Sequence, residues 1–525
     1  MYENIRPLKV NIISDIHYYS KETGVSGKAF EKENAKTPND LLHCEEILSS
    51  LMQQLSDDDS DIVLVSGDVT TRAEKEAHEG VIRLLRSLKE KGKRVYVITA
   101  THDFHDGDVT RKFDGDEDVE VPAVKRDELF DMYREFGPDE AISVHRDSMS
   151  YVVQLCDGYR LFALNDDRNH KGASGFSDDC FEWITEQIKD AQEKGQFIIP
   201  MTHHPMLSPS PFYKIIGGGN IMGEADRRID EFTEMGLNYM FTGHTHMQDI
   251  SYKYTDNGKV FYDITTAAAI GYPATFRHVT FIPAEGKIDV SSVDVKYDID
   301  GRPLKEHLED KFFGMIRRVV DAAGKDIPEL ARLATAFSVK EKLIYKIGWI
   351  IKPFAKILGK LKIGTIAKLV KKESGLKKSD YAHIKDQKVV DFIVSLVRNL
   401  YGGDSPYSPD TAEYKITMGI LAIIDDLLRL FKVSIGKLVK GATSVQNLVE
   451  PLLYNPGICD EKAVLNLFRD LPPVPGENAG FVRSRKGLPI VILLVLLVLT
   501  FLPVILLWLG FGFVINQIRY GKLMK

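Results

Sequence analysis

The chain has 525 residues, enough for two or three domains that each bury a core of their own. Its four cysteines are widely spaced and form no CxxC pair, which argues against a disulfide framework or a zinc ribbon. The net charge of −7 combines an acidic part, residues 1–300 with 33 Lys and Arg against 54 Asp and Glu, and a basic part, residues 301–525 with 35 against 21. A basic part of this kind suits a polyanion such as nucleic acid or an anionic lipid surface.

Between residues 8 and 298, short apolar runs alternate with helix-like stretches. Eight of the runs have the length and the β-branched content of buried strands, namely "KVNIIS", "DIVLVS", "RVYVIT", "YVVQL", "RLFALN", "FIIPMT", "NYMFTG" and "KVFYDITT". The segments "KEAHEGVIRLLRSLKEKG" and "SDDCFEWITEQIKDAQEKG" predict helices that end at a glycine. This order predicts an α/β layered fold built around packed sheets. The acidic segment 104–126 is expected to be an exposed insertion, with the length of an active-site loop.

Beyond residue 300 the strand signals end and helical patterns take over. Apolar residues recur every three to five positions from Leu343 to Leu369, and twelve lysines lie from Lys340 to Lys378. Such a helix either packs on its own domain with a solvated basic face or lies in the interface of an anionic membrane. A membrane anchor further along the chain favours the second alternative. Two more helical segments are expected, near 387–401 and 414–440.

One long uncharged segment, Gly487 to Ile515, lies near the C-terminus. Its 29 residues exceed the roughly 30 Å of a bilayer's hydrocarbon core at about 1.5 Å per residue, so we predict one tilted or kinked membrane span. The proline-rich "RDLPPVPGEN" before it is typical of a stiff linker. The positive charges close to the span are equal on its two sides. The missing signal peptide and the lysines on the N-terminal side favour a cytoplasmic N-terminal part at the cell membrane.

Five short motifs present metal-ligand side chains at or just beyond the ends of apolar runs. They are "SDIH" with Asp15 and His17, "SGDV" with Asp68, "THDF" with His102 and Asp103, "THHP" with His203, and "GHTH" with His244 and His246. Loops after strand ends are where an α/β fold exposes catalytic groups. A single histidine is more often structural than a ligand. Five of fourteen histidines in these positions point to one shared site.

The residue types indicate the chemistry. Mixed carboxylate and imidazole ligands suit two borderline divalent metal ions such as Mn, Fe or Zn. Two such ions about 3.5–4 Å apart bind the oxygens of a phosphoester and lower the pKa of a bridging water, which becomes the nucleophile. Asp68 is the expected bridging carboxylate. A histidine can protonate the leaving oxygen, and Asp103, directly after His102, could orient that ring.

The ordered set DxH, GD, HD, HxP and GHxH resembles the calcineurin-like metallophosphoesterase superfamily over residues 8–285. The resemblance implies an αββα sandwich with the site at one edge of the central sheets. It also implies a first metal held by Asp15, His17, Asp68 and His246, and a second held by Asp68, His203 and His244. His102 would protonate the leaving group or hold the phosphate, with Asp103 behind it. The expected division is a metallophosphoesterase catalytic domain at 1–300, a basic, mostly α-helical domain at 301–480 and a transmembrane anchor at 487–515.

Thr101 departs from the family pattern. Members of the family usually have Asn before the His-Asp pair, and its side-chain oxygen ligates the second metal. A threonine hydroxyl is shorter and a poorer neutral donor, so it can be only a weak ligand that reaches the metal through a water. We therefore expect a second metal site that is weaker but present, because His203, His244 and Asp68 remain.

The leading hypothesis is a membrane-anchored, metal-dependent phosphoesterase. Its substrate would be a lipid-linked or nucleotide-type phosphoester, with a diester favoured over a monoester, and its basic region would hold it at an anionic membrane surface. The alternative is a catalytically degenerate, membrane-tethered binding or scaffold protein, which Thr101 supports. A nuclease is disfavoured by the anchor and by the acidity of residues 1–300, so no nucleic-acid partner is expected. The oligomeric state stays open.

Overall fold

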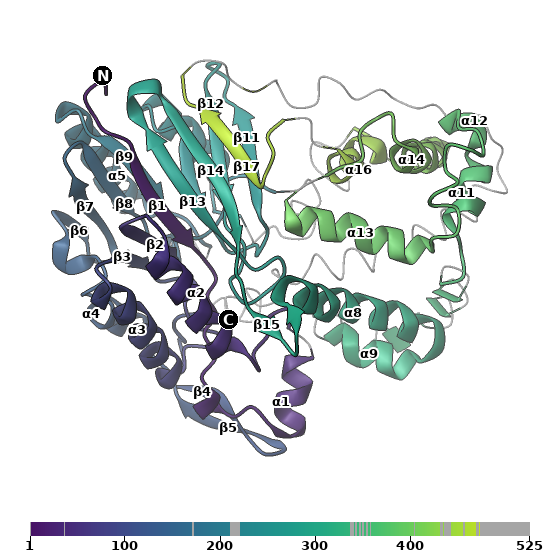
Figure 1. Cartoon of the computed structure of the whole chain (residues 1–525), viewed down its shortest axis with the longest axis horizontal. Coiled ribbons are helices and arrows are strands. Elements are labelled where there is room, and N and C mark those ends of the chain that lie inside the picture. Colours follow the sequence, from purple (N-terminus) through teal and green to yellow (C-terminus); the bar gives the residue numbers. More distant parts are fainter. Residues whose placement is uncertain are drawn as a thin grey trace.

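The computed structural model in Figure 1 places a body of sheets and flanking helices beside a group of further helices. It describes residues 2–35, 37–170, 173–209, 221–335, 359–403, 405–430, 443–454 and 457–468, with the short pieces 341, 344–345, 348, 351–352, 355–356, 434 and 472.

The first sheet has six strands in the order β17-β14-β13-β1-β2-β3. Their bounds are β1 Leu8–Ile13, β2 Ile62–Ser66, β3 Arg94–Ile98, β13 Thr275–Ile282, β14 Lys287–Asp294 and β17 Lys462–Asn466. Strands β1, β2 and β3 run parallel, whereas β13 pairs antiparallel with both β1 and β14. Parallel strands end at the same edge of a sheet, so the loops that follow β1, β2 and β3 lie together.

The second sheet has seven strands in the order β11-β12-β10-β9-β8-β7-β6. Their bounds are β6 Ser143–His145, β7 Ser150–Cys156, β8 Tyr159–Ala163, β9 Phe197–Met201, β10 Tyr239–Thr242, β11 Asp249–Tyr254 and β12 Val260–Thr265. Strands β8, β9, β10 and β12 are parallel to one another. All eight apolar runs predicted as strands are confirmed, as β1, β2, β3, β7, β8, β9, β10 and β12.

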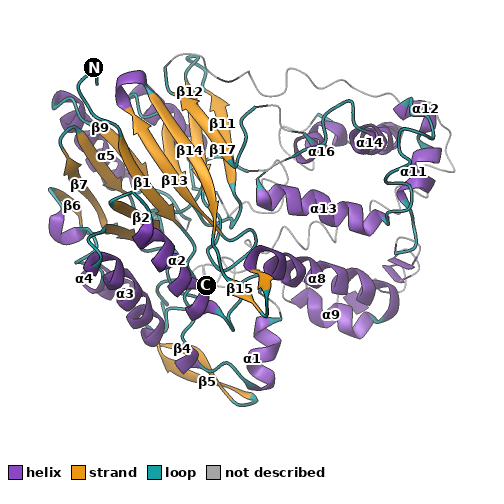
Figure 2. Cartoon of the chain, in the orientation of Figure 1, coloured by secondary structure: helices purple, strands orange, loops and turns teal. Residues whose placement is uncertain are grey.

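The two sheets pack face to face with helices on both outer sides (Figure 2). Alternate residues of β1 divide between the layers: Val10 and Ile12 enter the core between the sheets, whereas Ile13 enters the core under the first helical layer. That layer contains α2 (Cys44–Asp57) and α3 (Lys75–Glu90), and the opposite layer contains α5 (Asp178–Glu193) and α7 (Ala225–Glu234). The predicted αββα sandwich is confirmed, as are the predicted helices α3 and α5.

The acidic segment 104–126 is largely a β-hairpin rather than the predicted loop. Strands β4 (Val109–Asp114) and β5 (Glu117–Pro122) pair antiparallel, and Phe113 packs between Tyr19 and Phe30. Two buried aromatic residues, Phe104 and Phe113, therefore anchor a segment whose charges suggested only exposure. The remaining short elements near the sandwich are η1 Lys21–Thr23, α1 Gly27–Asn34, α4 Arg126–Met132, η2 Pro138–Glu140, η3 Pro283–Glu285, β15 Asp298–Ile299 and β16 Arg302–Pro303.

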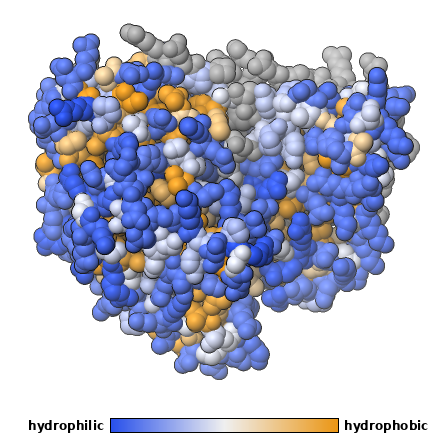
Figure 3. Space-filling view, in the orientation of Figure 1, coloured by the Kyte–Doolittle hydropathy of each residue, from blue (hydrophilic) through white to orange (hydrophobic). Residues whose placement is uncertain are grey.

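Helices predominate after residue 303. Their bounds are α8 Leu304–Lys325, α9 Ile327–Thr335, α11 Ile363–Leu369, α12 Lys371–Ser374, α13 Val389–Gly402, α14 Ala412–Leu430 and α16 Val445–Leu453. Helices α13 and α14 confirm the two predicted near 387–401 and 414–440. On the face seen in Figure 3, hydrophilic residues cover most of this helical region.

The helical region packs against the sandwich at the loops after β10 and β12. Phe312 and Phe313 of α8 lie between two tyrosines, with ring centres 4.9 Å from Tyr401 and 5.5 Å from Tyr272 respectively. The backbone N–H of Gln248 donates to the Tyr401 carbonyl at 3.0 Å. Gln248 follows the "GHTH" motif closely, so the helices are in contact with the loop that carries two predicted ligands.

The chain returns to the first sheet after the helices, which the sequence did not predict. Strand β17 pairs antiparallel with β14, with Lys287 opposite Asn466. Just before it, the carbonyl of Asp460 accepts a hydrogen bond from the buried Arg277 guanidinium, and its Oδ1 accepts one from the Ile250 N–H at 2.7 Å. The expectation that strands end at residue 300 was wrong, because a five-residue strand far along the chain completes the sheet.

No helix within the described residues is long and apolar enough to cross a membrane. The predicted anchor at 487–515 and most of its linker lie outside those residues. Much of the predicted lysine-rich helix around 340–360 also lies outside them.

His78 on α3 makes folding sensitive to acid. Its Nδ1 lies 2.8 Å from the Tyr133 hydroxyl and its Nε2 lies 2.9 Å from the Asp103 carbonyl, and burial lowers its pKa from 6.5 to about 4. Below pH 6.5 the unfolded chain binds a proton that the folded chain excludes, so the free energy of unfolding falls until about pH 4. His78→Gln keeps a donor and an acceptor without a titrating group. We expect it to remove up to about 3 kcal/mol of this acid loss.

Denaturant unfolding of the metal-stripped chain between pH 7 and pH 4 measures this effect. The wild-type and His78→Gln curves should diverge below pH 6.5, with the variant losing less stability. Parallel curves would show that His78 takes up its proton in the folded state and would contradict the prediction.

Candidate metal centre

The five motifs lie at the carboxyl ends of parallel strands from both sheets. Asp15 and His17 follow β1, Asp68 follows β2, and His102 follows β3. His203 follows β9, and His244 and His246 follow β10. The sandwich brings these strand ends to one edge, so residues 229 positions apart come into contact: the His244 N–H donates to Asp15 Oδ2 at 2.8 Å.

Five of these residues have left-handed backbone conformations. Their φ angles are 49° at Asp15, 45° at His17, 49° at Asp68, 67° at His244 and 59° at His246. This region is uncommon for residues other than glycine, and its strain is kept only where the surroundings enforce it. The strain therefore gathers at the motifs that the sequence had singled out for metal binding.

Asp15, His17 and His246 form the first group. His17 Nε2 and His246 Nε2 are 2.9 Å apart, and they lie 3.6 and 3.4 Å from Asp15 Oδ1. The Nδ1 of His17 lies 3.2 Å from the Thr70 carbonyl, which leaves its Nε2 to face the other two ligand atoms. A backbone partner on the far nitrogen is the usual way to orient a metal-ligating histidine.

Asp68, His203 and His244 form the second group. His203 Nε2 lies 3.1 Å from Asp68 Oδ2, and His203 Nδ1 lies 2.8 Å from the Ser66 carbonyl. One ligand atom from each of the three residues lies within 4.8 Å of the others. The two groups adjoin, because the His17 N–H donates to the backbone carbonyl of Asp68 at 3.0 Å.

Two glycines permit this close approach. A Cβ at Gly243 would lie 1.8 Å from Ser14 Oγ and 2.6 Å from Asp15 Oδ2. A Cβ at Gly67, which has a φ of 99°, would lie 2.6 Å from His203 Nδ1. The glycines of "SGDV" and "GHTH" are thus required because a side chain would collide with the ligand of a neighbouring strand.

His102 lies beside the second group with its reactive nitrogen toward it. Its Nδ1 lies 2.9 Å from the Thr71 carbonyl, and its Nε2 lies 4.0 Å from Asp68 Oδ2. Its side chain is 21% exposed and that of His246 is 22% exposed, and His244 is half-buried, whereas Asp15, His17, Asp68 and His203 are buried. The open face of the site therefore lies on the side of the His102 and His246 rings.

The Asp103 carboxylate accepts hydrogen bonds from the backbone of two loops. It does not orient the His102 ring, as the sequence had suggested. Its Oδ1 accepts from the Thr70 N–H at 2.7 Å and its Oδ2 from the Ala100 N–H at 2.8 Å. Burial and the nearby Asp68 charge raise its pKa to about 7. The Thr71 carbonyl is the contact made by His102 Nδ1, so Asp103 acts on the backbone around the ring. Thr101 is buried at 2% exposure in the same turn.

The pKa values of the two predicted ligand carboxylates, Asp15 and Asp68, lie below the usual range despite their burial. Burial raises the pKa of Asp15, but its interactions with His17 and His246 outweigh this and hold the pKa well below the usual range. Burial also raises the pKa of Asp68, and the charges of His203 and His102 outweigh it in the same direction. Two buried negative charges stand at adjacent positions, which makes the site attractive to cations.

The pKa values of His203 and His244 shift in opposite directions. Burial lowers the pKa of His203, but the Asp68 carboxylate outweighs burial and raises it to about 10. Burial and the neighbouring His204 hold the pKa of His244 well below its usual value. A bound cation must displace the proton from His203, so its binding would release protons and weaken in acid.

The atoms that a metal would use are unsatisfied. Asp15 Oδ1 and both ring nitrogens of His244 are buried and have no hydrogen-bond partner among the described residues, and His203 Nε2 makes no aligned hydrogen bond although Asp68 Oδ2 lies 3.1 Å away. Such groups are costly unless a ligand or ion satisfies them. Another His-Asp group, at the contact between α2 and α8, provides a contrast. There Asp40 Oδ2 lies 3.0 Å from His43 Nδ1 and 2.8 Å from His307 Nε2, within hydrogen-bond distance of both. The predicted residues therefore fit divalent metal ions, and the Asp40 group is satisfied without one.

His204 and Asp166 belong to the surroundings of the site but were not among the predicted site residues. The His204 ring centre lies 4.3 Å from that of His244, and its Nδ1 lies 3.2 Å from Asp166 Oδ2. Only the doubled histidine of "THHP" signals His204. Nothing in the local pattern around "LNDD" marks Asp166, which comes to the site through the pairing of β8 with β9.

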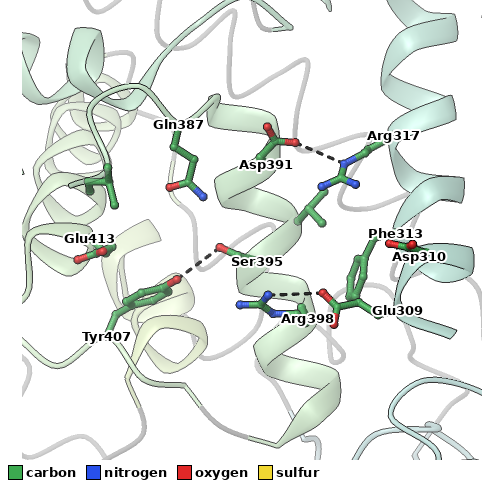
Figure 4. Close-up of a pocket in the computed structure, with 12 residues that line it drawn as sticks. Glu309, Asp310, Phe313, Arg317, Gln387, Asp391, Ser395, Arg398, Tyr407 and Glu413 are labelled. Carbon is green, nitrogen blue, oxygen red and sulfur yellow. Dashed lines mark hydrogen bonds and ion pairs between the residues drawn. The ribbon is translucent and has the colours of Figure 1, made fainter. Parts of the chain in front are cut away.

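A separate cavity of about 380 Å³ lies between α8 and α13 (Figure 4). Its charged side chains pair across it, Arg317 with Asp391 at 3.4 Å and Arg398 with Glu309 at 3.5 Å. Among the described residues, none of those that line it belongs to a group of metal ligands like the one at the strand ends. The metal ligands predicted from the sequence therefore gather at the strand ends of the sandwich and not at this cavity.

Comparison with known proteins relates residues 8–248 to one family. A calcineurin-like phosphoesterase family model matches residues 8–248, which ends before the predicted limit of 285. The chain is similar to a dimetal phosphatase from Danio rerio, at 11% identity over 56% of this chain and 98% of that one, with a TM-score of 0.39. It is also similar to purple acid phosphatase PPD1 from yellow lupin (Lupinus luteus) seeds, at 14% identity over 57% of this chain and 52% of that one, with a TM-score of 0.36. No curated protein matches the sequence. Residues 8–248 are a calcineurin-like phosphoesterase domain.

Proposed function

We propose that the protein is a phosphoesterase that uses two divalent metal ions. Asp15, His17 and His246 would hold one ion and His203 and His244 the other, with Asp68 between them. The observation that carries this proposal is the pair of adjoining three-ligand groups with unsatisfied, buried ligand atoms. Bound ions would supply an activated water and neutralise the charge of the phosphate.

The chain's own residues would admit the ester, protonate the leaving oxygen and hold the loops of the site in place. The open face at His102 and His246 admits the ester from the solvent side. The Thr71 carbonyl holds His102 Nδ1, so the Nε2 can carry a proton to the leaving oxygen. Asp103 links the turn that carries His102 to the loop that carries Asp68, because its Oδ1 accepts a hydrogen bond from the Thr70 N–H. We infer a phosphodiester as the preferred substrate, with a monoester as the alternative.

The membrane part of the proposal rests on the sequence. We infer that residues 487–515 anchor the chain and that the lysine-rich segment holds the acidic domain against an anionic leaflet of the cell membrane, on its cytoplasmic side. Fractionation tests this: the full chain should sediment with membranes, and a chain that ends at residue 480 should not. Recovery of the full chain in the supernatant would contradict it.

Substitution of Thr101 distinguishes an enzyme from the alternative hypothesis, a membrane-tethered scaffold protein with a degenerate site. Thr101→Asn restores the family's amide ligand, and we expect the affinity of the more weakly bound metal ion to rise at least about tenfold. Mn²⁺ titration of the EDTA-stripped chain measures this, and hydrolysis of bis-p-nitrophenyl phosphate is followed in parallel. Turnover by the wild-type chain supports the enzyme. Hydrolysis by the Thr101→Asn variant, with none by the wild type, would favour the scaffold.

A further inference from the structure

Asp263 is a fully buried carboxylate that lies close to the second ligand group without belonging to it. It is part of β12, where its neighbours Tyr262 and Ile264 enter the core between the sheets, so its own side chain points to the opposite face. It belongs to none of the groups of possible metal ligands among the described residues. A buried carboxylate is costly unless its oxygens are paired, so its partners indicate why it is there.

One oxygen of Asp263 holds the loop that carries His203. Asp263 Oδ2 accepts hydrogen bonds from the backbone N–H groups of Met206 at 2.5 Å and of Leu207 at 2.8 Å. These are the third and fourth residues after His203, and Pro205 before them has no N–H to donate. This oxygen therefore fixes the backbone just beyond one ligand of the second group.

The other oxygen of Asp263 binds the strand that leads to His244. Thr242 Oγ1 donates a hydrogen bond to Asp263 Oδ1, and Thr242 is the last residue of β10, two positions before His244. The Gly243 N–H also donates to the His203 carbonyl at 2.9 Å. The two ligand loops are thus joined once by their own backbone and a second time through Asp263.

We propose that Asp263 is a positioning residue of the second metal site, which fixes the loop of His203 and the strand end of His244 relative to each other. It acts through backbone and hydroxyl groups and not on the ligand rings. Ligands bind a metal tightly only where the surrounding contacts hold them in the right geometry. Burial raises the pKa of Asp263 to about 6, so the carboxylate is mostly ionised above pH 7 and accepts these bonds. The inference rests on the proposed dinuclear site.

Three substitutions separate the parts of this role. Asp263→Leu keeps the approximate size of the side chain and removes both acceptor oxygens. Asp263→Asn keeps an oxygen for Met206 and Leu207, and its amide group can donate to Thr242 Oγ1. Thr242→Val keeps the shape of that side chain and removes only the bond between Asp263 and β10.

Two matched controls lie elsewhere in the chain. Asp425→Leu is the control for Asp263→Leu, because Asp425 is also a buried aspartate that accepts two consecutive backbone N–H groups, at the start of α16. Thr233→Val is the control for Thr242→Val, because Thr233 is buried and its hydroxyl donates to a backbone carbonyl within α7. Both controls should keep the metal affinity of the wild type.

The test measures metal binding by the full chain. The EDTA-stripped wild type and variants are titrated with Mn²⁺, and the affinity of each bound ion is determined. We expect two ions in the wild type, with one of them bound about 10–100-fold more weakly in Asp263→Leu and about tenfold more weakly in Thr242→Val. Asp263→Asn should lose less than Asp263→Leu. In a His203→Ala background, Asp263→Leu should cause no further loss, because both changes act on the same ion, and a further loss would overturn the proposal.

The other outcomes separate this role from the proposed function. Two ions of unchanged affinity in Asp263→Leu, beside two in the wild type, would overturn the role of Asp263 alone. Equal weakening of both ions, or an equal loss in the Asp425→Leu control, would also overturn it, because either result describes a general loss of structure. Fewer than two ions in the wild type would overturn the dinuclear site and the role of Asp263 with it. If Asp263→Leu does not fold, Thr242→Val decides: selective weakening of one ion supports the proposal, and unchanged affinity overturns it.

Discussion

Asp68→Asn is expected to abolish hydrolysis and to remove at least one bound metal ion. The Asp68 carboxylate lies 3.1 Å from His203 Nε2, and the backbone carbonyl of Asp68 accepts a hydrogen bond from the His17 N–H, so this residue contacts both groups. Asparagine keeps the size of the side chain and an oxygen for the His102 N–H, which Asp68 Oδ1 accepts at 2.9 Å. It removes the negative charge that a bridging ligand needs. Bound metal contributes several kcal/mol to such a reaction, so we expect a loss of at least about a thousandfold.

Asp40→Asn is the matched control for this variant. Asp40 is also a buried aspartate that bonds two histidines, but its group is satisfied and lies at the contact between α2 and α8. The control should keep wild-type metal content and turnover. Equal metal content in Asp68→Asn and the wild type would contradict the role of Asp68.

His102→Gln is expected to lower kcat by about 10²–10⁴-fold while both metal ions stay bound. Neither ligand group contains His102, and its Nε2 lies 4.0 Å from Asp68 Oδ2 on the open face. Glutamine can still donate to a phosphate oxygen, but it cannot deliver a proton. The loss should therefore be smaller for a p-nitrophenyl ester, whose leaving group is acidic, than for an alkyl ester that must be protonated as it leaves.

Steady-state kinetics with both kinds of ester measure this difference, and metal analysis of the same samples shows that the site is intact. His278→Gln is the control, because His278 lies on the interior strand β13, where its Nδ1 is 3.4 Å from Asp58 Oδ1, and it belongs to none of the motifs. Equal losses for the two esters would assign His102 to phosphate binding. Unchanged kcat would remove it from the catalytic machinery.

The sandwich was predictable because its strands are buried on both faces. Runs such as "DIVLVS" and "FIIPMT" are continuous apolar sequences that only a covered parallel strand explains, and they became β2 and β9. The grouping of the predicted ligands at one edge was predictable for a related reason. Each follows such a run, so parallel pairing alone brings their loops to one edge.

Other features depend on contacts that no local pattern records. Strand β17 is only five residues long and alternates exposed and buried positions, and it finds its partner β14 after a helical region of about 150 residues. Asp103 was expected to orient His102 because it is the next residue, but the turn directs its carboxylate to the backbone of Thr70 and Ala100. Adjacency in sequence does not determine the direction of a side chain in a tight turn.

The most direct test of the metal-dependent phosphoesterase is hydrolysis by the full wild-type chain before and after metal removal. Bis-p-nitrophenyl phosphate and p-nitrophenyl phosphate are supplied to the chain as purified, after EDTA stripping, and after Mn²⁺ is restored. We expect turnover that disappears on stripping and returns with Mn²⁺, together with two bound ions per chain and faster hydrolysis of the diester. Turnover that survives complete removal of metal would contradict the assignment, and so would a chain that binds two ions and hydrolyses neither ester.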